Sequence, residues 1–136
     1  MRFHLSTEQV AIQDAVRGTL ADVFPIERLH KHADSDADID VDSWAALMAL
    51  GLGGLLLPEA DGGSGLGLLD AALVAEVVGE AAATGPVGAQ MLVALAVSRS
   101  GNAAAKAHLA GLASGETIAT LASDDLPENW TAMPTG

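Results

Sequence analysis

The sequence contains no cysteine and no tyrosine, and it has only two phenylalanines and two tryptophans among 136 residues. Without cysteine the chain has no disulfide framework, no thiolate zinc site and no cysteine nucleophile. Basic residues are also scarce, with 6 lysines and arginines against 18 aspartates and glutamates, which gives a net charge of -12. Because phosphate contacts depend on basic side chains, this balance excludes nucleic acid as the main partner.

A signal peptide and long membrane-type runs are missing as well. The first six residues lack the apolar core of a secretion signal. Two charge-free stretches, 43–58 and 81–98, are interrupted by glycine and proline. Neither reaches the roughly 20 strongly apolar residues that a membrane span needs. We therefore expect no membrane-spanning segment, and the cytoplasm is the expected location.

Small aliphatic side chains dominate what is present. Half of the residues are apolar, and most of these are alanine or leucine. This mixture favours closely packed helices over a sheet, which would be richer in β-branched and aromatic residues. The sequence predicts an all-α fold, a helical bundle of about five helices, with one short strand over 117–122 near the C-terminus.

Apolar residues at three- to four-residue spacing mark the five helices. The first follows a capping box at Ser6 and ends near Pro25. The second is capped by Asp42 and stops at Gly51, and the last is capped by Asn102. The third to fifth helices are expected over 68–83, 87–100 and 103–113. The residues expected to face inward are Trp44, Leu47, Met48 and Leu50 in the second helix, and Ala72, Leu73, Ala75, Val77 and Val78 in the third.

The glycine-rich segment 62–67 is the first candidate for chemistry. It does not match a dinucleotide fingerprint or a P-loop, because Leu68 stands where the third glycine or the lysine is required. It does not match a nucleophile elbow, because Leu66 replaces the final glycine. The pattern indicates a tight turn that needs positive φ.

Acidic and histidine side chains gather in two other places. The run 33–42 alternates five aspartates with small or apolar residues, but no register supplies the glycine and glutamate of a calcium loop. We interpret it as a solvated acidic connector, and a metal-binding role stays the alternative. His30 and His32 do not share a helix face, and Glu76 and Glu80 form a carboxylate stripe expected to be solvated. No metal site is predicted.

One longer arrangement is more specific than these parts. It runs through Trp44-x-x-Leu47-x-x-Leu50-Gly51-Leu52, Leu57-Pro58-Glu59-x-x-Gly62-Gly63-x-Gly65, Gly101-x-x-x-x-Lys106-x-x-Leu109 and Gly115-Glu116-x-Ile118. In order and spacing it resembles the N-terminal region of the acyl-CoA dehydrogenases, over residues 5 to about 122.

The resemblance implies that residues 1–122 form the family's N-terminal helical domain, and that 123–136 begin a missing β-domain or form a loose tail. In this family FAD is held mainly by later domains and a neighbouring subunit, and the catalytic carboxylate lies in a C-terminal bundle. The implied partners are those domains and subunits, in a homo- or hetero-oligomeric flavoprotein oxidoreductase of lipid metabolism, together with the acyl-CoA substrate. No catalytic residue is expected in this chain, and FAD is not expected to bind it alone.

The same resemblance implies one wall of the acyl pocket. Its candidate residues are Val87, Gly88, Met91 and Leu92, with ordinary helix packing as the alternative. Their small neighbours suit a roomy pocket for a bulky, steroid-derived thioester. The family's usual Glu-Pro pair and Gly-Ser-Asp turn are absent from 123–130. The alternative function is therefore a non-catalytic helical interaction module or a diverged subunit of a heteromeric dehydrogenase.

Overall fold

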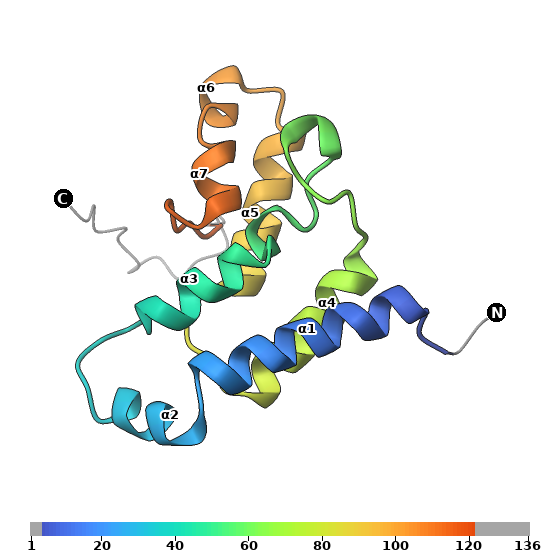
Figure 1. The fold of residues 1–136 in the computed structure, drawn as a ribbon. Coiled ribbons are helices and arrows are strands. Elements are labelled where there is room, and N and C mark those ends of the chain that lie inside the picture. The colour runs from blue at the N-terminus through green and yellow to red at the C-terminus, as the bar shows by residue number, and fades with distance from the viewer. Residues whose placement is uncertain (1–3, 122–136) are drawn as a thin grey trace, which may run out of the picture.

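The computed structural model describes residues 4–121, and these form an all-α fold (Figure 1). In chain order the α-helices are α1 (Thr7–Val23), α2 (Ile26–Ala33), α3 (Val41–Ala49), α4 (Leu68–Glu80), α5 (Val87–Arg99), α6 (Ala103–Lys106) and α7 (Leu109–Ser114). Two 3₁₀ turns, Leu52–Gly54 and Glu59–Asp61, lie between α3 and α4. The predicted fold class is confirmed.

The predicted C-terminal strand is wrong for residues 117–121, which pair with no other strand among the described residues. Residue 122 and the predicted start of a β-domain at 123–136 lie outside the described residues. The strand expectation came from local β-propensity alone. A strand needs hydrogen-bond partners for its backbone N–H and C=O groups. In residues 117–119 the partner is the side chain of Gln90 and not a second strand.

Two helical elements differ from the sequence prediction. Helix α2 was not predicted, because it carries too few apolar residues to show a periodic pattern, and none of its side chains is fully buried. The single helix expected over 103–113 is instead two helices, α6 and α7, separated by a turn before Leu109. The cap at Asn102 is confirmed, because its side-chain oxygen accepts from the N–H groups of Ala104 and Ala105 at 3.0 and 3.2 Å.

The prediction that Asp42 caps the N-terminus of α3 is wrong. Asp40 caps the helix, since its Oδ1 accepts from the Ser43 N–H at 2.9 Å, whereas Asp42 lies in the first turn. Asp40 is fixed there by Arg28 of the unpredicted α2, which donates to both carboxylate oxygens at 2.7 and 2.9 Å. Helix α3 also ends at Ala49, so Leu50, which was expected to face inward, is 41% exposed.

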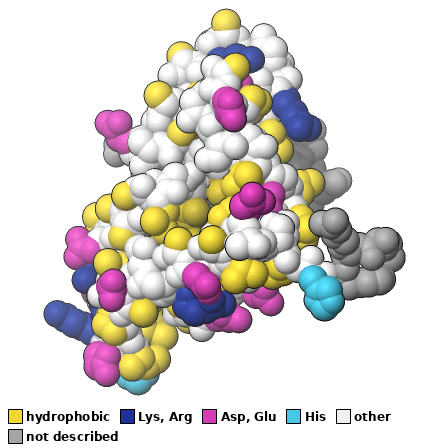
Figure 2. Space-filling model, turned by 45° about the vertical axis from the view of Figure 1, so that its right-hand side comes forward, with side chains coloured by type: hydrophobic (Ala, Val, Ile, Leu, Met, Phe, Trp, Pro, Cys, Tyr) yellow, Lys and Arg dark blue, Asp and Glu magenta, His cyan; other side chains and the backbone are white. Residues whose placement is uncertain are grey.

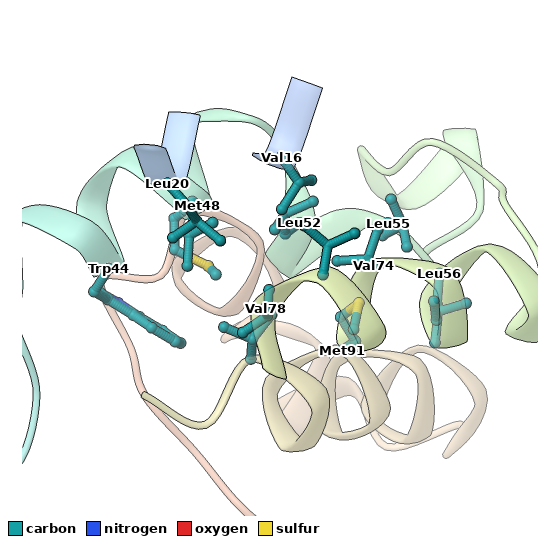
Figure 3. Packing of buried hydrophobic residues seen from close by; sticks show 14 of the residues in the cluster. Val16, Leu20, Trp44, Met48, Leu52, Leu55, Leu56, Val74, Val78 and Met91 are labelled. Carbon is teal, nitrogen blue, oxygen red and sulfur yellow. The ribbon is translucent and has the colours of Figure 1, made fainter. Parts of the chain in front are cut away.

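The core consists of two hydrophobic clusters. The larger one joins α1, α3, α4 and the start of α5, and Figure 3 shows its side chains converging between these helices. The smaller one is made by Leu57, Val93, Ala94, Leu109 and Leu112. Helix α5 contributes to both clusters, so its position is fixed from two sides.

Helix α4 has two apolar faces, and the chain buries only one of them. Val77 and Val78 are buried as predicted, but Ala72 and Ala75 are exposed, and Ala71 and Val74 fill the core instead. The acidic side chains of α4 lie next to α1, and Glu76 and Glu80 remain exposed to solvent there, as expected. There Asp70 accepts from Gln9 at 2.9 Å, and Glu76 and Glu80 likewise contact α1.

A pH prediction follows from the pair Arg28–Asp40, in which Asp40 is 9% exposed. Burial raises the pKa of Asp40, but hydrogen bonds from Arg28 and Ser43 outweigh it and leave the pKa lowered. A lowered pKa stabilises the fold above the unfolded value of about 3.9, and this contribution is lost as the pH falls through the folded value. Asp40→Asn keeps a capping side chain but removes the charge, so we expect a loss of about 1–3 kcal/mol at pH 7.

Urea unfolding between pH 7 and pH 2.5 checks this expectation. The stability difference between wild type and Asp40→Asn should shrink as the pH falls below 4. Asp42→Asn is the matched control, because Asp42 also bonds Arg28 but is 75% exposed, and it should cost less than about 1 kcal/mol. If the difference in unfolding free energy between wild type and Asp40→Asn stays constant from pH 7 to pH 2.5, the lowered pKa of Asp40 is contradicted.

Candidate functional site

The start of α5 is set by a glycine that no other residue can replace without strain. Gly85 has a φ of +115°, and a Cβ at this position would lie 2.8 Å from the Trp44 ring. The next turn is closed by hydrogen bonds from Val87 N to the Gly85 carbonyl and from Gln90 N to the Pro86 carbonyl, at 3.0 and 2.8 Å. The Gly85-Pro86 break and the helix after it thus match the sequence prediction.

The four residues predicted to line an acyl pocket divide between two sides of α5. Val87 and Met91 are each only 2% exposed and belong to the larger hydrophobic cluster. Gly88 is exposed and Leu92 is 46% exposed. The first two therefore pack inside the domain, and only Gly88 and Leu92 lie on a face that another molecule or domain is free to contact.

Gly88, Leu92 and Ala96 lie one helical turn apart, and we refer to these three residues as the outer face of α5. A Cβ added at Gly88 would meet no heavy atom within 4 Å. Helix α5 carries no charged residue before Arg99 at its last position. The outer face is therefore apolar, and none of its three residues carries a charged or polar side chain.

The glycine-rich loop is a turn, as predicted, and its backbone is already engaged. Gly62 and Gly65 have φ values of +83° and +65°. Gly63 lies so close to Leu57 that an added Cβ would overlap the Leu57 carbonyl. The N–H groups of residues 62–66 all donate to carbonyls of 54–59, and that of Gly67 donates to Asp70 at 2.9 Å. Since a phosphate cradle needs free N–H groups, this loop does not form one.

The acidic run and the histidines also take structural positions. Asp40 and Asp42 both accept from Arg28, so the end of the run is an ion-paired cap rather than a free connector. His32 lies edge-on to Phe24, with ring centroids 6.3 Å apart. Among residues 4–121, no three histidine or acidic side chains are grouped so that they could hold a metal ion.

Gln90 is the polar side chain near this site that the sequence analysis missed. It is fully buried, and its Nε2 donates to the carbonyls of Leu112 and Thr117, both at 2.7 Å. Its Oε1 accepts from the Ala119 N–H at 3.0 Å. The available signal was its position as an amide within the charge-free stretch 81–98, where a polar group must find partners inside the protein.

Comparisons with known proteins agree with this architecture. The family model described as "Acyl-CoA dehydrogenase, N-terminal domain" matches residues 6–116. The chain therefore belongs to the acyl-CoA dehydrogenase family, and it corresponds to the helical N-terminal domain.

Among solved structures, a variant of the steroid acyl-CoA dehydrogenase Tcur3481-Tcur3483 is similar to this chain at 33% sequence identity and a TM-score of 0.75. The match covers 83% of this chain and 31% of that one, so the chain spans about a third of its length. No curated protein matches the chain.

The family generally uses FAD, but the residues described here do not fit a flavin or CoA-phosphate site. The glycine-loop N–H groups are consumed within the fold, and every buried side-chain nitrogen or oxygen in the described residues has a hydrogen-bond partner. On the face shown in Figure 2, the basic side chains are few and do not gather into a single patch. Among the described residues, no helix is long and apolar enough to cross a membrane.

Proposed function

We propose that this domain supplies one wall of the acyl pocket in a flavin-dependent acyl-CoA dehydrogenase that acts on bulky, steroid-derived thioesters. The observation that carries the proposal is the outer face of α5, where Gly88 leaves open space beside the 46% exposed Leu92. An uncharged face with a missing side chain suits a wide apolar ligand. The similarity to a steroid acyl-CoA dehydrogenase supports the same substrate class.

The rest of the reaction belongs to other parts of the protein. FAD supplies the redox chemistry when it is bound, and the domains beyond residues 1–122 and neighbouring subunits hold it. The carboxylate that removes the α-proton also comes from outside this chain. What this chain contributes is the shape of the acyl site, and not a reacting group.

Thiol labelling in the flavin-bound assembly tests the proposal, because the chain has no cysteine of its own. Leu92→Cys places a single thiol on the outer face of α5. We expect a bulky acyl-CoA to slow maleimide labelling of this thiol by roughly tenfold, since pockets of this kind cover most of their ligand. Acetyl-CoA, which has neither a bulky acyl group nor a free thiol that would consume maleimide, should have little effect.

Ala11→Cys is the control variant, because Ala11 is an exposed position on α1, away from α5. Its labelling rate should not respond to the thioester. Labelling of Leu92→Cys that is equally fast with and without a bulky acyl-CoA would contradict the pocket assignment.

The second candidate function, a non-catalytic interaction module or diverged subunit, is favoured by the exposed face of α4. Leu68, Ala72, Ala75 and Gly79 lie on this face without a charged residue among them. A helix that is apolar on opposite sides is usually buried on both. Protection of Leu92→Cys by assembly alone, with no further protection by thioester, would favour this second function.

A further inference from the structure

The Gln90 carboxamide pairs with residues 117–119 as a strand would. Its Nε2 donates to the carbonyl of Thr117, and its Oε1 accepts from the N–H of Ala119. In a parallel sheet, one residue of a strand bonds the carbonyl and the N–H on either side of its neighbour in this way. The side chain therefore takes the place of a single sheet residue opposite Ile118.

We propose that Gln90 is a positioning residue that fixes where the chain leaves the helical domain relative to α5. The same side chain also bonds the Leu112 carbonyl of α7 at 2.7 Å, so three segments meet at one buried amide. The family match ends at residue 116, so the segment that Gln90 holds comes directly after the matched region. This role stands on the hydrogen bonds and does not depend on the proposed acyl-binding role.

The orientation of the amide is determined by its partners. A flipped carboxamide would direct its oxygen at the carbonyls of Leu112 and Thr117 and its NH₂ at the N–H of Ala119, which removes all three hydrogen bonds. Residues 117–119 are also held by a hydrogen bond from Thr117 N to the Gly111 carbonyl at 3.0 Å and by the packing of Ala119 against the smaller hydrophobic cluster. Beyond Thr117, the hydrogen bond from the Ala119 N–H to Gln90 is the polar contact between the described part of this segment and the helices.

Site-resolved amide hydrogen exchange on Gln90→Met tests this role, because methionine has a similar volume but no amide. Protection of the Ala119 amide should fall by at least about fivefold, the equivalent of one net hydrogen bond. Ser98→Ala is the matched control, since it removes another buried polar side chain from α5 without touching residues 117–119. It should leave Ala119 protection unchanged. An equal loss of protection across α1 and α4 in Gln90→Met would overturn the proposal in favour of general destabilisation.

Gln90→Glu adds a readout that a merely space-filling residue would not give. At neutral pH its carboxylate would face the carbonyls of Leu112 and Thr117, and Ala119 protection should be low. Burial and these carbonyls raise the pKa of such a carboxyl. Its protonated form resembles the amide, so protection corrected for the intrinsic exchange rate should return as the pH falls toward 5. Gln90→Met, measured at the same pH values, should show no return. Parallel pH profiles for the two variants would also overturn the proposal.

Discussion

Trp44→Ala is expected to destabilise the domain by about 3–5 kcal/mol, the range for removing a large aromatic side chain from a core. Trp44 is 6% exposed, and its ring fills the space left by Gly85 at the start of α5. Its Nε1 donates to the Gly115 carbonyl at 3.0 Å, which joins α3 to the end of α7. One side chain thus supports the larger cluster, the break before α5 and the C-terminal segment. Urea unfolding followed by far-ultraviolet circular dichroism measures the effect.

Trp44→Phe separates the two contributions. It keeps most of the aromatic volume but leaves the Gly115 carbonyl without its donor, so a smaller loss of about 1–3 kcal/mol is expected. If Trp44→Ala costs no more than Trp44→Phe, the packing against Gly85 is not the main contribution of this residue. That result would contradict the description of how α5 is held.

The elements that the sequence predicted well are those with strong local signals. The capping box at Ser6 is present, with the Gln9 N–H donating to the Ser6 hydroxyl at 3.1 Å. The break at Gly85-Pro86 and the cap at Asn102 are present too. Each of these depends on residues within a few positions of one another, so the sequence alone contains the needed information.

The elements that the sequence did not predict depend on contacts between distant residues. The cap of α3 moved from Asp42 to Asp40 because Arg28, twelve residues earlier, holds the Asp40 carboxylate. Periodicity also cannot tell which of two apolar helix faces is buried, and this is why Ala72 and Ala75 of α4 were placed inward. At the site, the family resemblance indicates the helix but not which of its faces is exposed, so the candidates include Val87 and Met91 together with residues on the opposite side of α5.

Gln90 was missed for a related reason. A glutamine within an apolar helix gives no motif, and its role becomes visible only when α7 and residues 117–119 are placed beside it. What the sequence did contain was the resemblance to the acyl-CoA dehydrogenase family, and the match over residues 6–116 confirms it. The family fixes the architecture, whereas the structure was needed to show which side of α5 is buried and which is exposed.

Gly88→Leu is expected to change which thioesters the flavin-bound assembly can use. The glycine lies on the exposed side of α5 with free space around it, so leucine should fit in the isolated domain and slightly favour the helix. In the proposed pocket the new side chain would occupy room needed by a wide acyl group. We expect kcat/KM for a steroid-derived thioester to fall by about 10–200-fold, the range for steric changes of this size in an apolar pocket.

Gly18→Leu is the matched control, because Gly18 is also a helical glycine with nothing within 4 Å of an added Cβ, but it lies on α1. It should leave kcat/KM unchanged for both a steroid-derived thioester and a short straight-chain acyl-CoA. It also accounts for any general effect of placing leucine on the surface of the helical domain.

The ratio of kcat/KM for a steroid-derived thioester to that for a short straight-chain acyl-CoA tests the central claim most directly. In Gly88→Leu this ratio should fall at least about tenfold relative to wild type, because only the wide substrate meets the new side chain. A ratio that does not change, whether both activities are retained or both are lost equally, would contradict the assignment of the outer face of α5 to the acyl pocket.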